Sequence, residues 1–312
     1  MAPSDMTTAR LIRVDQSGNG DFKKIQEAID SVPSHNNELV FIWVKPGTYR
    51  EKIVVPKEKP FITISGNKAS DTIITGNEGR DLLQSPVVSV FASDFIGRFL
   101  TIQNTFGTTG IAVALRVSAD RAAFYGCRII SFQDTLLDDV GRHYFKSCYI
   151  EGATDFICGN ATSLYEKCHL HSTSDRGGAM TAQHRNTAEE NTGFVFLGGK
   201  ITGSGSTFLG RPWGDFSRVM FGYTYMSNVV EPQGWNDWGD QSKQRFVMDI
   251  YIERCRMENS NAMGQEQTEP DGWVGHAAYP RMRLQNSSPK TSLAVELGFD
   301  LHHLISKGAS PS

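Results

Sequence analysis

Apolar residues along this chain fall in short runs separated by polar and glycine-rich turns, a pattern typical of many short strands. The runs cover residues 40–44, 61–65, 87–91, 99–103, 113–117, 122–130, 144–150, 163–170, 193–197 and 218–225. One segment differs, because Ile25, Ala28, Ile29 and Val32 recur at helical spacing before Pro33. This spacing predicts one short amphipathic helix, which we expect to cap the open N-terminal end of the first strands.

Three strand segments repeat one another. Each ends in a cysteine, and an aspartate follows seven residues later. The cysteines are Cys127, Cys148 and Cys168, and the aspartates are Asp134, Asp155 and Asp175. Spacings of 21 and 20 residues between the cysteines are too short for two packed helices, so each repeat is predicted to be one coil of a parallel β-solenoid. Neighbouring strands lie about 4.8 Å apart, so Asp134 and Asp155 are expected to form a pair, and either neighbouring pair of these cysteines could form a disulfide.

Composition adds limits to this picture. The chain has 312 residues, of which 39% are hydrophobic and 21% charged, with a net charge of -3, which is typical of a soluble globular protein. The basic residues are scattered among the acidic ones, which argues against a nucleic-acid partner. No apolar run is long enough to span a membrane, and the N-terminus has no signal-peptide core. The five cysteines and eight histidines fit no metal motif, so no metal is expected.

The paired aspartates suggest chemistry. Two carboxylates about 5 Å apart cannot easily both ionise, so one is expected to keep its proton while a cation such as Arg211 holds the other ionised. The ionised group could attack an ester, and Gln133 could donate hydrogen bonds to the oxyanion. Trp213 near Arg211 suits a carbohydrate acid. The alternative is a polar ladder that only satisfies turn backbone groups. Asp175 supports this alternative, because it shares the phase but lacks the glutamine and aromatic neighbours.

Over roughly residues 10–240 the chain resembles the plant-type pectin methylesterases, or pectinesterases. The segments that carry the resemblance are Gly47-Thr48-Tyr49-Arg50-Glu51, Ala112-Val113-Ala114-Leu115, Gln133-Asp134-Thr135-Leu136, Asp155-Phe156-Ile157-Cys158-Gly159 and Leu209-Gly210-Arg211-Pro212-Trp213. The resemblance implies an all-β fold, the right-handed parallel β-helix. It also implies hydrolysis of the C6 methyl esters of homogalacturonan to pectate and methanol, without a metal or another cofactor.

By this resemblance, Asp155 is the nucleophile, Asp134 is the general acid/base, and Gln133 stabilises the anionic tetrahedral intermediate. Arg211 would orient and ionise Asp155. The positions implied to contact or face the substrate are Thr75, Ile111, Arg211 and Trp213. The family disulfide falls on Cys148 and Cys168, which is the pairing that the resemblance selects from the two that spacing allows.

This chain departs from the family pattern at several positions. Ile111 stands where a second oxyanion glutamine is usual. Loss of one such donor costs about 100- to 1000-fold in rate. We therefore expect reduced activity, with a catalytically weak pectin-binding homologue as the alternative. Cys158 and Leu137 replace aromatic residues, which we interpret as tuning. A solenoid lyase or polygalacturonase is a poorer match, because its site would need other carboxylate clusters.

The domain prediction follows from the resemblance. Residues 1–10 are expected to be an unstructured segment, residues 11–248 the β-helix domain, and residues 249–312 an atypical tail. After Trp238 the family's closing segments are absent, so we hypothesise that the tail arose by a frameshift or mis-splicing. Secretion to the cell wall, pectin as substrate, a proteinaceous pectinesterase inhibitor as candidate partner and a monomeric state are expected by resemblance.

Overall fold

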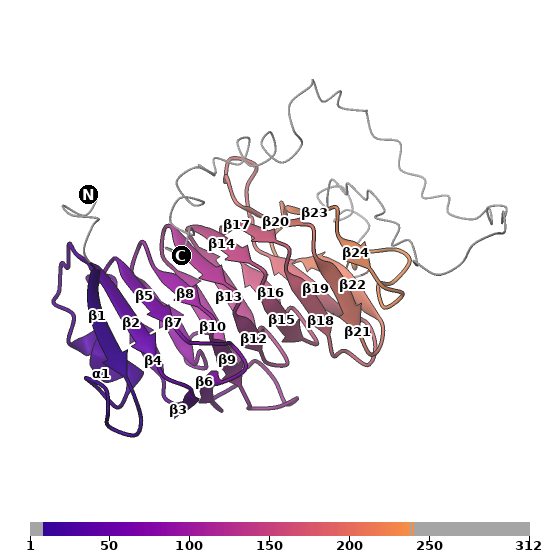
Figure 1. The fold of residues 1–312 in the computed structure, drawn as a ribbon. Helices are drawn as coiled ribbons and strands as arrows, with labels where there is room; N and C mark the ends of the chain where they lie inside the picture. The colour runs from indigo at the N-terminus through magenta and orange to yellow at the C-terminus, as the bar shows by residue number, and fades with distance from the viewer. Residues whose placement is uncertain (1–8, 238, 240–312) are drawn as a thin grey trace, which may run out of the picture. The chain divides into compact units, whose positions relative to one another are not determined.

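The computed structural model describes residues 9–237 and 239, in which successive coils of chain stack on one another (Figure 1). A regular coil contributes one strand to each of three sheets, here called A, B and C, and neighbouring strands within each sheet run parallel. This arrangement confirms the right-handed parallel β-helix that the sequence predicted.

The three sheets have nine, eight and seven strands. In spatial order, sheet A contains β1 (Ala9–Val14), β2 (Leu39–Val44), β5 (Ile62–Ser65), β8 (Ile96–Arg98), β11 (Ala122–Tyr125), β14 (Arg142–Lys146), β17 (Thr162–Glu166), β20 (Gly193–Leu197) and β23 (Val219–Gly222). Sheet B contains β3 (Gly47–Arg50), β6 (Thr72–Gly76), β9 (Thr101–Asn104), β12 (Arg128–Ile130), β15 (Tyr149–Gly152), β18 (His169–Ser172), β21 (Lys200–Gly203) and β24 (Tyr225–Met226). Sheet C contains β4 (Ile53–Val55), β7 (Val88–Val90), β10 (Leu115–Ser118), β13 (Leu136–Val140), β16 (Ile157–Gly159), β19 (Gly178–Gln183) and β22 (Thr207–Pro212).

The boundaries of the fold differ slightly from the prediction. Strand β1 begins at Ala9, so it includes two residues that the sequence placed in the N-terminal segment. The rest of that segment, and the tail predicted over residues 249–312, lie outside the described residues. In the part of the chain that the structure describes, no helix is long and apolar enough to cross a membrane.

Among the described residues one helix, α1 (Ile25–Asp30), forms where the helical spacing predicted it, and its apolar face is buried. Its first turn is capped from another segment, because the Glu51 carboxylate accepts hydrogen bonds from the N–H groups of Ile25 (3.1 Å) and Gln26 (3.0 Å). A carboxylate at this end also complements the helix dipole. The helix packs against β1, β2 and β4. Its role as a cap on the stack stays a prediction.

Four segments that were each predicted as a single strand form two strands in the structure, one in sheet A and one in sheet B. They are residues 122–130, 144–150, 163–170 and 218–225. The chain turns between them at a residue with left-handed backbone, such as Gly126 (φ 58°), Ser147 (φ 53°) or Lys167 (φ 53°). One residue in this conformation is enough to redirect an extended chain. The alternation of side chains is broken at the same place, so the cysteine that follows each turn lies inside the coil.

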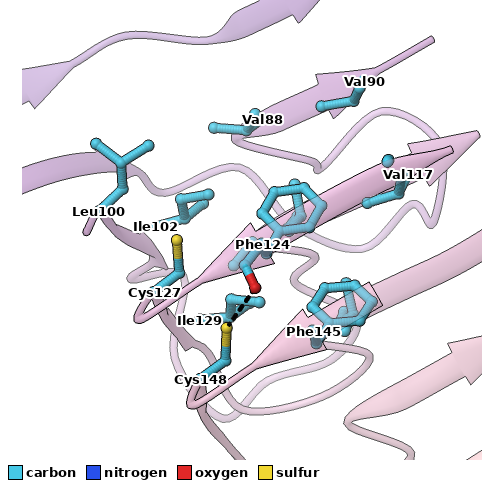
Figure 2. Close-up of a cluster of buried hydrophobic side chains, with 14 of the residues drawn as sticks. Val88, Val90, Leu100, Ile102, Val117, Phe124, Cys127, Ile129, Phe145 and Cys148 are labelled. Atoms are coloured by element: carbon cyan, nitrogen blue, oxygen red, sulfur yellow. Dashed lines mark hydrogen bonds between the residues drawn. The ribbon is translucent and has the colours of Figure 1, made fainter. Parts of the chain in front are cut away.

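The cysteines form a ladder, and Figure 2 shows Cys127 and Cys148 in successive coils among apolar side chains. The Cys148 and Cys168 side chains are nevertheless free thiols, as are the other cysteines among the described residues. Each thiol donates to a carbonyl oxygen of the preceding coil, from Cys148 to Phe124 at 3.5 Å and from Cys168 to Phe145 at 3.4 Å. The disulfide implied by the resemblance is therefore not formed in this structure.

An aromatic stack fills the interior beneath sheet A. Consecutive rings lie 5.1, 4.7, 4.5 and 4.5 Å apart between centroids and are within 15° of parallel. The rings belong to Phe124, Phe145, Tyr165, Phe196 and Phe221. Since each aromatic pair adds about 0.5–1.5 kcal/mol beyond the burial of its area, the stack fixes the register of the coils that carry the site.

Candidate active site

The predicted carboxylates lie at the corner where the chain passes from sheet B to sheet C. Gln133 and Asp134 fill this corner between β12 and β13, and Asp155 fills it between β15 and β16. Gln133 is bridged to Ile111 on one side and to Thr154 on the other, and the Asp134 N–H donates to the Thr154 carbonyl at 3.1 Å. Asp134 and Asp155 therefore occupy neighbouring rungs, at a spacing of about 4.8 Å.

Both aspartates have left-handed backbone, with φ of 56° for Asp134 and 48° for Asp155. Both side chains belong to residues that are only 8% exposed. Left-handed backbone is unfavourable for residues other than glycine and persists where the surroundings enforce it, often at functional sites. Its occurrence at the same position in two successive coils shows that the fold imposes one geometry on both carboxylates.

Asp175, which shares the phase in sequence, does not join the pair. It is exposed, in the turn between β18 and β19. The Asp155 N–H donates to the Ala179 carbonyl at 2.6 Å, so Ala179 lies opposite Asp155 in the next coil. The longer turn of that coil moves Asp175 out of register.

Arg211 separates the roles of the two carboxylates. It lies in β22 opposite Ala182 of β19, which in turn lies opposite Cys158 of β16. From there its Nε donates to Oδ1 of Asp155 at 2.7 Å, and a terminal N–H donates to Oδ2 of the same carboxylate. This two-pronged contact favours the ionised form of Asp155 and holds the carboxylate in one orientation.

The two carboxyl groups differ in proton affinity. Burial, together with the charge of Asp155, raises the pKa of Asp134 to about 7, and Arg211 offsets only part of this effect. Burial also raises the pKa of Asp155, while the hydrogen bonds and charge of Arg211 lower it. In the structure burial outweighs the arginine, so the pKa of Asp155 is raised and not lowered. Asp155 ionises before Asp134 because Arg211 stabilises its charge, and that charge then helps to keep the proton on Asp134.

A small apolar cluster includes Cys158, which lies near enough to Asp134 and Asp155 for their charges to act on its thiol. It is separate from the main core, and Ile111 and Leu82 pack against it. Its buried members are Val113, Leu137, Cys158 and Ala182. Burial and the nearby Asp134 and Asp155 raise the pKa of the Cys158 thiol, so Cys158 acts here as a neutral, apolar side chain. Leu137 and Cys158, the two replacements of aromatic residues, thus belong to this cluster, which we call the apolar floor.

Trp213 is 42% exposed and follows Arg211 at the end of β22. Its indole stacks on the imidazole of His184, with centroids 4.2 Å apart and an angle of 18° between the planes. One indole face is therefore held by His184. The sequence did not single out His184, because a lone histidine after a strand gives no signal of a stacking partner far along the chain.

Thr75 lies apart from the carboxylates. It is buried and accepts a hydrogen bond from Gln103 Nε2 at 3.2 Å. Thr75 is opposite Gln103, and Gln103 is opposite Ile130 in the coil that contains Gln133. Thr75 therefore lies two rungs before that coil, about 10 Å along the stack. The structure thus brings together Ile111, Gln133, Asp134, Asp155 and Arg211. Among the described residues no three His, Cys, Asp or Glu side chains gather as a metal site.

Comparison with known proteins agrees with this geometry. The pectinesterase family model matches residues 11–279, which extends beyond residue 248. Pectinesterase 11 of Arabidopsis thaliana is 67% identical over 245 residues, covering 78% of this chain and 70% of that protein. Pectin methylesterase from carrot superposes with a TM-score of 0.73 at 33% identity, covering 80% of this chain and 82% of its own. A pectin methylesterase in complex with a hexasaccharide superposes with a TM-score of 0.65 at 26% identity, covering 74% of this chain and 82% of its own. This chain belongs to the pectinesterase family of carboxylic ester hydrolases and has the function of a pectin methylesterase.

Proposed function

We propose that this protein hydrolyses the C6 methyl esters of homogalacturonan with Asp155 as nucleophile and Asp134 as general acid/base. The observation that carries the proposal is the pair of buried carboxylates in neighbouring coils, of which Asp155 is held by Arg211 at 2.7 Å. One carboxyl group is thereby ionised and oriented, and the other keeps a proton up to about pH 7. Enzymes use such divergent pairs to assign an acid and a nucleophile.

In the first half of the reaction, an oxygen of Asp155 attacks the carbonyl carbon of the ester. The carbonyl oxygen becomes negative, and the side-chain amide of Gln133 donates to it. When the intermediate collapses, the bond to the methoxy oxygen breaks and this oxygen takes the proton of Asp134. Methanol leaves, and the galacturonate acyl group stays on Asp155 as an anhydride.

In the second half, Asp134 is ionised and takes a proton from a water molecule. The water oxygen attacks the acyl carbon, and the bond to Asp155 breaks. The products are the carboxylic acid of a galacturonate unit, which releases its proton to solvent, the free carboxylate of Asp155 and the protonated acid of Asp134. The pair returns to its starting state, so the cycle needs no metal and no other cofactor.

The substrate assignment rests on the surroundings of the pair. The exposed indole of Trp213 offers one face to a sugar ring, and Thr75 lies about 10 Å away along the stack. This distance corresponds to about two rungs of the stack, and a related pectin methylesterase was solved in complex with a hexasaccharide. As further parts of this proposal, the protein acts as a secreted monomer in remodelling the plant cell wall, and a proteinaceous pectinesterase inhibitor is its candidate partner.

One observation favours a second candidate function, a pectin-binding homologue with little turnover. Ile111 is bridged to Gln133 and packs against the apolar floor, so an apolar side chain faces the place where a second oxyanion donor would stand. The missing donor reduces the rate under both candidates. The question is whether turnover remains.

Methanol release from highly methylated pectin tests both candidates. The wild type should release methanol, Asp155→Ala should release none, and Asp175→Asn should match the wild type because Asp175 is exposed and out of register. The activity of the wild type should fall as the pH rises above about 7, where Asp134 loses its proton. If the folded wild type binds pectin but releases no methanol, the second candidate replaces the first.

A further inference from the structure

A second surface gathers unusual side chains, at the corner where the chain passes from sheet A to sheet B. From the turn between β8 and β9 to the turn between β23 and β24, the chain adopts left-handed backbone at this corner, and Phe99, Lys167 and Tyr223 are the large side chains there, with φ of 52°, 53° and 53°. The coils between them have Gly126, Ser147 and Gly198 at this place. The three large side chains therefore form a sparse row along the solenoid axis, three and two rungs apart.

A second row runs beside the first, on the strands of sheet B that lie next to one another in Figure 1. Its members open the strands β12, β15, β18, β21 and β24 and are directly opposite one another in register. They are Arg128, Tyr149, His169, Lys200 and Tyr225. The Arg128 guanidinium lies 4.8 Å from the centroid of the Tyr149 ring, so the row interleaves cations with aromatic rings.

Positive charge predominates in the two rows and their flanks, which we call the basic–aromatic strip. Its cations are Arg98, Arg128, Lys146, Lys167 and Lys200. Two acids oppose them, Glu166 at 3.9 Å from Lys146 and Glu151, which accepts the Tyr149 hydroxyl. The strip is thus net positive on a chain whose net charge is -3. His169 adds no charge at neutral pH, because burial and the nearby Lys200 and His171 lower its pKa to about 4.

Exposed aromatic rings are concentrated in the same strip. Phe99, Tyr223 and Tyr225 are 38%, 39% and 45% exposed. Among the residues that the structure describes, the only other large aromatic side chain that is equally exposed is Trp213 of the candidate active site. Aromatic faces that alternate with Lys and Arg suit sugar rings that carry carboxylates, because the rings stack while the cations pair with the acid groups.

We propose that the basic–aromatic strip binds demethylated pectin, the polygalacturonate that the esterase reaction produces. This inference rests on the proposed function, since demethylation turns each neutral ester into an anion. The rung spacing of about 4.8 Å is close to the length that one sugar adds to an extended polysaccharide, so successive carboxylates can meet successive rungs. The strip and the catalytic corner are the two margins of sheet B and run parallel, so processed and unprocessed stretches of pectin can lie along the same molecule.

Binding of fully demethylated polygalacturonate, measured by isothermal titration calorimetry at low salt, tests the proposal. The double variant Arg128→Gln/Lys200→Gln removes two exposed charges of the strip. The matched control Lys23→Gln/Lys57→Gln removes two exposed charges outside the strip. Exposed ion pairs contribute modestly to binding, so the loss of two of them should make the strip variant bind about tenfold more weakly, and the control should match the wild type.

Several outcomes would overturn the proposal: no loss of affinity in the strip variant, an equal loss in the control, or an equal loss for fully methylated pectin. Circular dichroism establishes that both double variants are folded. Methanol release from a short methylated galacturonate oligomer is measured in parallel and decides the proposed function by itself. Polygalacturonate contains no ester, so the loss of affinity in the strip variant relative to the wild type reports on the strip whether or not the protein turns over.

Discussion

The proton of Asp134 should have a measurable cost in stability at neutral pH. The pKa of this carboxyl group is about 7 in the folded protein, against an ordinary value of 3.8. Between these values the folded state keeps a proton that the unfolded chain has released. The contribution of Asp134 to the free energy of unfolding therefore falls as the pH rises from about 4 to about 7 and is constant above this window. Each tenfold difference in proton affinity corresponds to about 1.4 kcal/mol, so the loss amounts to about 4 kcal/mol.

Replacing Asp134 by Asn removes the titrating group and keeps the shape of the side chain. Asp134→Asn and the wild type should have similar stability at pH 4, and the variant should become more stable as the pH rises. At pH 8 the difference of about 4 kcal/mol corresponds to a midpoint of thermal unfolding that is higher by about 10 °C for a domain of this size. Circular dichroism melts at pH 4, 6 and 8 measure it, with the exposed Asp175→Asn as control. A constant difference between variant and wild type across this range would refute the assigned proton affinity.

Three further changes test single contacts. Ile111→Gln should raise the kcat for methanol release by at least about tenfold, because it restores a donor beside the oxyanion. The same change should lower the melting midpoint, because Ile111 packs on the apolar floor. An unchanged kcat would contradict the argument that a donor is missing. His184→Ala should raise KM for pectin about 3- to 10-fold with little change in kcat, because the stacking of His184 on Trp213 contributes about 0.5–1.5 kcal/mol. His184→Phe should restore KM. Equal effects of the two changes would exclude stacking as the cause. Phe145→Ala, within the aromatic stack, should lower the free energy of unfolding by about 3–5 kcal/mol in urea, whereas the exposed Leu83→Ala should change it little.

The stacking of the coils was predictable because its signal is local and repeated. The cysteine and the aspartate recur at one phase, and strands of equal phase must stack. The corner between sheets A and B was not predictable in the same way. Gly126, Ser147 and Lys167 all adopt left-handed backbone there, but they share no residue type, so four stretches were interpreted as single strands. The constraint acts on backbone shape, and a comparison of side chains alone does not reveal it.

Strand β13 shows a second limit. Residues 136–140 were not predicted as a strand, because two of the five residues are aspartates, which strands disfavour. Asp138 is nevertheless fully buried, with Oδ1 2.5 Å from His143 Nδ1 and Oδ2 accepting the Tyr165 hydroxyl at 2.6 Å. Tyr165 lies 27 residues away in another coil. A charge becomes tolerable in a core only through such partners, and which partners meet depends on the register of the finished stack.

The candidate site was predicted better than its surroundings. Gln133, Asp134, Asp155 and Arg211 meet as the motif implied, because they belong to corners and strands of adjoining coils. The apolar floor beside them was not predicted, since it combines single residues from separate coils. Leu137 and Cys158 appeared only as departures from a family pattern, whereas in the structure they are buried members of one apolar cluster.

The different chemistry of the two aspartates depends on a contact across two rungs. Asp134 and Asp155 have the same corner position, the same backbone conformation and equal exposure, so the coil itself does not distinguish them. Arg211 does, because it donates two hydrogen bonds to the carboxylate of Asp155. It reaches back to Asp155 past Ala182, which lies opposite it in the intervening strand. A small residue at position 182 leaves room for that guanidinium, and a single side chain two rungs away thereby makes two equivalent carboxylates differ in proton affinity, which is the difference that the proposed mechanism uses.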